Sequence, residues 1–201
     1  FGLVVSPKSK AQTLADLKGK DIAVSSATII DFLLAQLLQQ EGAAPDFLNR
    51  QDIRQIPVRL QMLLSGQIES ALLPEPLVSL VAKGARTILN DCKLNTPLAV
   101  VALKRDVLDA PDGAQTVAKF REALREAAKR INGTPDAYRP IMEAKGLLPK
   151  GASANYTMVR FDMTHTPTGL PSEADIKTFA DWMKASRILK KDPAYGDVVF
   201  Q

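Results

Sequence analysis

The stretch DLKGKDIAVSSAT at residues 16–28 decides how the first half of the chain is interpreted. Residues 22–24 (IAV) form an apolar run that predicts a short buried strand, and Ser25 and Ser26 follow where a helix begins. The first turn of a helix has backbone N–H groups without intrahelical acceptors and carries a partial positive charge. Hydroxyl groups at this point can therefore cap the helix or, together with those amides, hold an anion or a polar ligand.

Strand and helix patterns alternate on both sides of this stretch. Strands are predicted at residues 1–5, 21–24, 52–57, 68–73 and 86–89, and helices at 27–41, 58–65 and 75–83. Gly42, Gly66 and Gly84 directly follow the three helices, where glycine commonly ends a helix. Such alternation predicts a mostly parallel sheet with helices on its faces.

The pattern changes near residues 94–103, which is the candidate boundary between two lobes. Residues 97–103 (PLAVVAL) predict a long buried strand, and the chain is mostly helical after it. Helices are predicted at residues 114–131 and 134–145, and a last one after the cap Ser172. Residues 156–163 predict a strand or an extended segment, and residues 198–201 an edge strand.

The composition excludes several classes of function. The 201 residues are 46% hydrophobic with a net charge of only +4, and the basic residues are spread along the chain, so nucleic acid is not an expected partner. One cysteine and one histidine leave no multi-cysteine metal site, and we expect neither a metal nor a cofactor. No apolar run approaches the roughly 20 residues that a membrane span requires.

Three segments together resemble a known family. They are DLKGKDIAV with its serines and helix, LLSGQIESA followed by LLPEPL at residues 63–77, and EALREAAKRINGTPDAYRPIMEAKGL with LPSEADIKTFADWM at residues 122–147 and 170–183. In order and spacing they resemble the periplasmic substrate-binding proteins of ABC importers. The most similar branch is the nitrate, taurine and alkanesulfonate group, which includes binding proteins for thiamine-pyrimidine precursors.

The resemblance implies an α/β fold of the periplasmic-binding-protein type II class, with two lobes joined by two crossing strands. Residues 1–5 would be one crossing strand, residues 6–96 the complete second lobe, and residues 97–201 the return strand with the helical part of the first lobe. The sheet of that first lobe has no counterpart here, so we expect the lobe to be incomplete in this chain. Apolar helix faces left without it would need another partner, such as a second copy by domain exchange.

The same resemblance implies a binding protein without catalysis. It would capture a small polar, anionic or zwitterionic solute, such as a sulfonate, taurine, nitrate or a pyrimidine precursor, in a cleft between the lobes. Delivery to the membrane permease of an ABC transporter implies a periplasmic or extracellular location, with or without a lipid anchor. Ser25, Ser26, Ala27 and Thr28 would contact the solute through hydroxyls and amides, although simple helix capping explains the same hydroxyls.

Three further residues are weighed for the site. Glu75 follows a predicted strand and either accepts from an amino group of the solute or stabilises the start of its own helix. A cleft position for this carboxylate would disfavour a purely anionic solute, because like charges repel. Thr96 precedes the second crossing strand and is a further candidate, while Arg59, early in a helix, is expected to be solvated.

Two other classes of protein share the implied fold. One is the ligand-sensing domain of a LysR-type transcription regulator, which carries an upstream helix-turn-helix. The other is an enzyme, such as a pyrimidine-precursor synthase or an enzyme of menaquinone biosynthesis. The synthase uses clustered cysteine and histidine residues, whereas Cys92 and His165 are far apart in this sequence.

Overall fold

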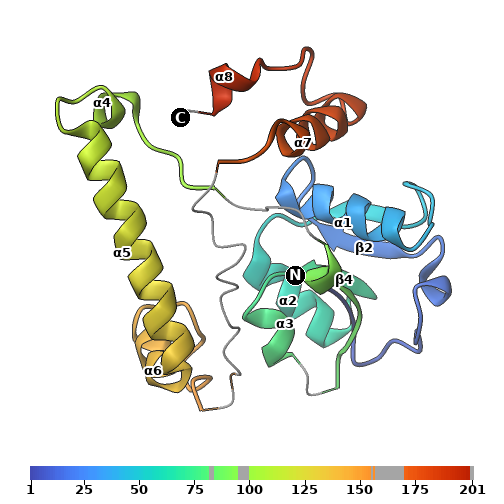
Figure 1. Ribbon diagram of the computed structural model, residues 1–201. Coiled ribbons are helices and arrows are strands. Elements are labelled where there is room, and N and C mark those ends of the chain that lie inside the picture. Colours follow the sequence, from blue (N-terminus) through green and yellow to red (C-terminus); the bar gives the residue numbers. More distant parts are fainter. Residues whose placement is uncertain (82–83, 95–99, 155, 157–169, 200–201) are drawn as a thin grey trace. The chain divides into compact units, whose positions relative to one another are not determined.

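The computed structural model describes residues 1–81, 84–94, 100–154, 156 and 170–199. The chain divides into two units, the first made of residues 1–96 and 172–198 and the second of residues 97–171 and 199–201 (Figure 1). The predicted division into residues 1–5, 6–96 and 97–201 stays a prediction. The contacts group residues 172–198 with the first part of the chain.

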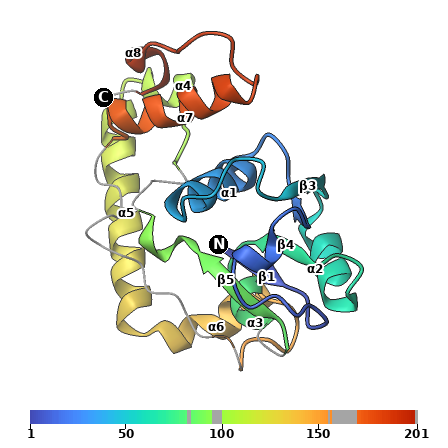
Figure 2. The same ribbon diagram turned by 90° about the vertical axis from the view of Figure 1, so that its right-hand side faces the viewer.

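A five-stranded sheet forms the centre of the first unit, in the order β3-β2-β4-β1-β5. Figure 2 labels β3, β4, β1 and β5 of this sheet. The strands are β1 (Gly2–Val5), β2 (Asp21–Val24), β3 (Asn49–Asp52), β4 (Ser70–Leu73) and β5 (Arg86–Asn90). β2 pairs in parallel with β3 and β4, whereas β1 is antiparallel to β4 and β5. Four strands therefore run in one direction and only β1 opposes them, which confirms the predicted mostly parallel sheet.

The helices of the first unit either connect these strands or come from the C-terminal residues 172–198. They are α1 (Ile29–Gln40), α2 (Ile56–Ser65), α3 (Leu77–Leu80), α7 (Glu173–Ala185) and α8 (Tyr195–Val198), with the 3-10 turns η1 (Ala15–Leu17) and η2 (Asp91–Lys93). Gly66 follows α2 with a φ of 75°, in the left-handed region that glycine adopts at low cost. Ser172 and Asp175 form a complete capping box at the start of α7.

The core of the first unit lies between the sheet and its helices. β1, β2, β4 and α1 supply most of its fully buried apolar side chains, among them Leu3, Val4, Ile22, Leu33, Leu34, Leu38, Leu72 and Leu73. Phe32 of α1 is also fully buried and contacts two rings of α7. Its ring centroid lies 4.4 Å from that of Phe179 and 5.4 Å from that of Trp182, so these contacts fasten α7 to α1.

Several predicted elements are placed differently. The strand expected at residues 52–57 lies at 49–52 as β3, because Pro57 fits the first turn of α2, where its missing N–H needs no acceptor. Residues 195–198 form α8, so the edge strand expected at 198–201 is wrong at Val198; residues 200–201 lie outside the described residues.

The strand predicted at residues 97–103 is absent from its described part. Residues 100–103 belong to no strand, and Val100 and Val101 are 67% and 57% exposed rather than buried. A strand requires a partner, and the described residues provide none for this segment. Residues 97–99 lie outside the described residues, and so do residues 157–163 of the strand or extended segment expected at 156–163.

The second unit is helical in its described part. It contains α4 (Arg105–Leu108), α5 (Gly113–Gly133) and α6 (Pro135–Ala144), and α6 continues past Pro140. Most apolar side chains of α5 stay partly in solvent, and Phe120 and Leu124 are 41% and 43% exposed. None of the helices described for this chain combines the length and the apolar character that a membrane span needs.

Candidate functional site

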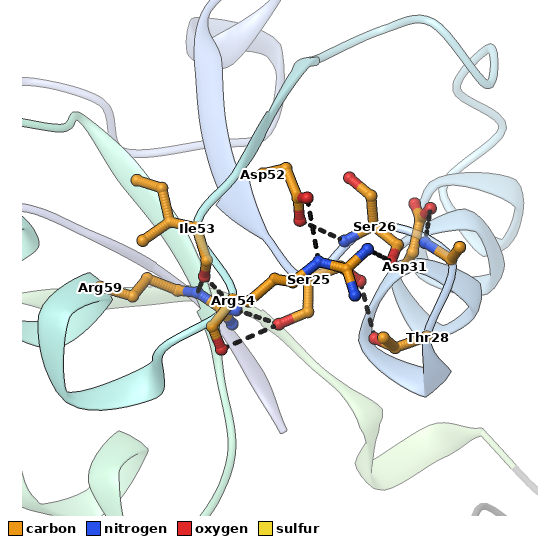
Figure 3. Close-up of polar contacts among 9 residues, drawn as sticks. Ser25, Ser26, Thr28, Asp31, Asp52, Ile53, Arg54 and Arg59 are labelled. Carbon is orange, nitrogen blue, oxygen red and sulfur yellow. Dashed lines mark hydrogen bonds and ion pairs between the residues drawn. The ribbon is translucent and has the colours of Figure 1, made fainter.

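Polar groups gather where β2 and β3 end side by side (Figure 3). Val24 is aligned with Asp52 in the parallel register, so the residues that leave both strands share one edge of the sheet. Ser25 and Ser26 leave β2 there, and Ile53 and Arg54 leave β3. The carboxyl edge of parallel strands is where open α/β sheets bind ligands, which makes this turn the candidate site.

The carboxylate of Asp52 accepts a hydrogen bond from the backbone amide of Ser26. The Ser26 N–H donates to Asp52 Oδ1 at 2.8 Å, and Arg54 Nε donates to Asp52 Oδ2 at 3.1 Å (Figure 3). The Ser26 amide, and to a smaller extent Arg54, hold the pKa of Asp52 below its ordinary value. Arg54 Nη2 also donates to the carbonyl of Ser26 at 3.3 Å, so one ion pair braces this serine from both sides.

The carboxylate of Asp31 accepts a hydrogen bond from the backbone amide of Ala27. The Ala27 N–H donates to Asp31 Oδ2 at 3.1 Å, and Arg50 Nε donates to Asp31 Oδ1 at 2.8 Å. Ala27 has a φ of 59°, a left-handed backbone that costs an L-residue about 1 kcal/mol or more. The turn between β2 and α1 is therefore held by two ion pairs in an uncommon conformation.

Thr28 is the N-cap of α1. Its hydroxyl accepts from the Ile30 N–H at 3.2 Å and donates to the carbonyl of Ser25 at 2.6 Å. The hydroxyls of this stretch were expected either to cap the helix or to bind a ligand. The hydroxyl that caps α1 is that of Thr28, and neither serine does so. Ser26 and Thr28 are half-buried and Ala27 is exposed, so this part of the turn is open to solvent.

Arg59 of α2 contacts the buried side of the turn. It is fully buried, and its guanidinium donates to Ser25 Oγ and to the carbonyl of Ile53 (Figure 3). It also donates to the carbonyl of Leu72. The Nε–O distance to Ile53 is 3.0 Å, and the Nη1–O distance to Leu72 is 2.7 Å. Ser25 Oγ in turn donates to the carbonyl of Arg54 at 3.4 Å, and Ser25 is only 6% exposed.

The expectation that Arg59 is solvated is wrong. Arg59 and Leu63 are the buried residues of α2 and lie one turn apart on the same face of the helix. Their spacing of four residues was the sequence signal for a shared buried face. Asp52 and Arg54 were also missed, because the strand expected at 52–57 placed them inside a strand instead of at its end.

The other predicted site residues are not brought to this turn by any contact that is described. Glu75 lies just before α3, and its carboxylate accepts from the hydroxyl of Ser79 at 2.9 Å and from the Ser79 N–H at 3.3 Å. This contact matches the interpretation in which Glu75 stabilises the start of its own helix. Thr96 lies outside the described residues.

Metal-binding groups are not assembled in the described part of the chain. Among those residues, no three His, Cys, Asp or Glu side chains are placed to hold a metal ion. Cys92 is an exposed free thiol after β5. The chemistry of the site is therefore that of hydroxyls, amides, carboxylates and guanidinium groups.

Comparison with known proteins relates the chain to one family and one fold. The family model described as NMT1/THI5 like matches residues 1–138. The periplasmic aliphatic sulphonate binding protein SsuA from Escherichia coli is 17% identical with a TM-score of 0.75, and the match covers 100% of this chain and 65% of that one. No curated protein matches the sequence.

Two further structures bear on the function. The alkanesulfonate-binding protein SsuA from Xanthomonas axonopodis pv. citri, bound to MOPS, is 20% identical with a TM-score of 0.65, over 95% of this chain and 66% of that one. The desulfurization enzyme DSZB is 17% identical with a TM-score of 0.58, over 98% of this chain and 72% of that one. The chain thus spans slightly less than two thirds of the length of the two binding proteins.

Proposed function

Because the chain belongs to the NMT1/THI5-like family, we propose that it acts as the solute-binding component of an ABC importer. Its fold is that of the type II periplasmic-binding proteins, as predicted from the three resembling segments. Export to the periplasm and delivery of the solute to a membrane permease are parts of this proposal.

The observation that carries the proposal is the turn at residues 25–28. It lies at the carboxyl edge of β2 and β3, and its exposed or half-buried residues 26–28 place amides and hydroxyls beside arginine and aspartate side chains. We assign solute contact to Ser26, Ala27 and Thr28, and a supporting role to the buried Ser25. Such groups suit a small polar solute that carries an anionic or zwitterionic head group.

The proposed solutes are those that the resemblance implies, namely a sulfonate, taurine, nitrate or a pyrimidine precursor. In this structure the amides of Ser26 and Ala27 already donate hydrogen bonds to the carboxylates of Asp52 and Asp31. A solute anion would take the place of one carboxylate, and an amino group would bind to the carboxylate instead. Glu75, at the rim of the cleft, and Thr96 remain further proposed contacts of the solute.

Calorimetry with the full chain tests this proposal. We expect one class in a panel of alkanesulfonates, taurine, nitrate and aminopyrimidines to bind. Ser26→Ala should weaken that binding by about fivefold to tenfold, the effect of one lost hydrogen bond. Ser65→Ala is the matched control, because its hydroxyl donates to the Met62 carbonyl at the other end of α2. Failure of every solute to bind, or equal effects of the two substitutions, would contradict the proposal.

An enzyme is the second candidate, because the fold is also that of the desulfurization enzyme DSZB. In the described residues the single thiol, that of Cys92, is exposed and lies on η2, not at the turn of residues 25–28. Turnover of a bound sulfonate or sulfinate, followed by product analysis, distinguishes the two functions. Release of sulfite from such a compound would favour the enzyme, and recovery of the unchanged compound favours the binding protein.

A further inference from the structure

We propose that Arg59 is a positioning residue of this site, which fixes Ser25 and the adjoining strand ends and makes the site prefer an anionic solute to an uncharged one. This inference rests on the proposed function. It concerns a side chain that does not touch the solute, because Arg59 is fully buried beneath the turn.

The contacts of Arg59 join three segments of the first unit. Its guanidinium donates to Ser25 Oγ after β2, to the carbonyl of Ile53 after β3 and to the carbonyl of Leu72 in β4. Residues 25, 53 and 72 are far apart in sequence, and one rigid planar group fixes all three. Arg59 therefore fixes the Ser25 end of the turn, and the ion pairs of Asp52 and Asp31 hold Ser26 and Ala27.

Among the described residues, no carboxylate forms a hydrogen bond or an ion pair with Arg59. Its hydrogen-bond acceptors in the described structure are two carbonyls and one hydroxyl, all of them uncharged. Burial lowers the pKa of Arg59, and the negative charge of Asp52 opposes this effect. A guanidinium group nevertheless stays protonated at neutral pH, so a full positive charge lies under the turn.

The two other arginines near the turn are paired with carboxylates. Arg50 and Arg54 each donate to a carboxylate, that of Asp31 at 2.8 Å and that of Asp52 at 3.1 Å. Each pair is close to neutral, and the Arg54 side chain is 65% exposed, so solvent screens it. Of the three arginines that contact this site, Arg59 is therefore the one whose positive charge would attract an anionic solute. Because its surroundings have a low dielectric constant, its electric field extends to Ser25 and Ser26.

The test compares two probes of similar shape and different charge, butane-1-sulfonate and butane-1-sulfonamide, with the full chain. The wild type should prefer the sulfonate. Arg59→Met should weaken sulfonate binding by about tenfold or more and sulfonamide binding by much less, as expected for loss of one nearby charge. Arg125→Met, which removes an exposed arginine paired with Glu122 on α5, should change neither affinity.

Arg59→Lys separates charge from geometry. Lysine keeps the charge but cannot bridge three segments, so both probes should bind more weakly while their affinity ratio is retained. A lost ratio in Arg59→Lys overturns the inference. If Arg59→Met does not fold, Arg59→Gln takes its place, because glutamine also removes the charge but keeps an amide donor: loss of the sulfonate preference supports the inference and a retained preference overturns it. Equal weakening of both probes by Arg59→Met would also overturn it, because that outcome describes a structural role alone.

Failure of this inference can be told from failure of the proposed function. If the wild type binds both probes equally, or only an uncharged or cationic solute of the wider panel, a binding protein remains and the inference about Arg59 falls. If the wild type binds no solute at all, the proposed function falls and the inference falls with it.

Discussion

Replacing Phe32 by alanine tests how the end of the chain is attached to the first unit. Phe32 is fully buried in α1, and its ring contacts Phe179 and Trp182 of α7 at centroid distances of 4.4 and 5.4 Å. A buried Phe→Ala change lowers the free energy of unfolding by about 3–5 kcal/mol. Each aromatic pair contributes about 0.5–1.5 kcal/mol of such a loss.

Urea denaturation of the full chain measures this change. Trp182 is the only tryptophan, so its fluorescence reports on the α1–α7 contact while circular dichroism reports on the whole fold. We expect Phe32→Ala to lower the free energy of unfolding in both signals and to shift the emission of native Trp182 to longer wavelength. Phe120→Ala is the control, because that side chain is 41% exposed and should cost far less.

A double-mutant cycle isolates the ring contact. If Phe32 and Phe179 touch, the losses caused by Phe32→Ala and Phe179→Ala will not add, and the coupling will be about 0.5–1.5 kcal/mol. Additive losses, or a Phe32→Ala variant with unchanged Trp182 emission, would refute the packing of α7 on α1.

Three further predictions concern single sites. Ser172→Ala removes the capping box of α7 and should lower the free energy of unfolding by about 1 kcal/mol in urea denaturation, a loss that Ser172→Asp should largely avoid. Gly66→Ala should destabilise the chain by about 1 kcal/mol, because φ is +75° and the new Cβ would lie 2.5 Å from Lys8 Cδ; Gly133→Ala, with open space around it, should be neutral or stabilising. The folded pKa of Asp52 lies below the ordinary 3.8, so the stability it contributes is present above that value and is lost as pH falls through the folded pKa. Asp52→Asn should therefore make stability less dependent on pH below about 4 in acid titrations, and a wild-type slope in the variant would contradict the Ser26–Asp52 contact.

Much of the first unit was predictable because its signals are local. The strand at 21–24, the helix after it and the glycine ends of the helices depend on residues within a few positions of each other. The same holds for the capping box at Ser172. Where the prediction failed locally, at β3, the competing signal was Pro57, which belongs to a helix start rather than to a strand.

The sequence by itself determined the strand–turn–helix at residues 16–28, the mostly parallel sheet and the family resemblance, because spacing and composition are readable along one chain. Only the tertiary structure decided what the serines of that turn contact. Asp52 reaches the Ser26 amide because β3 lies beside β2, and Arg59 reaches Ser25 because α2 packs on β4, the other neighbour of β2. Contacts between residues 26 or 34 positions apart depend on strand order and helix packing, which no local pattern specifies.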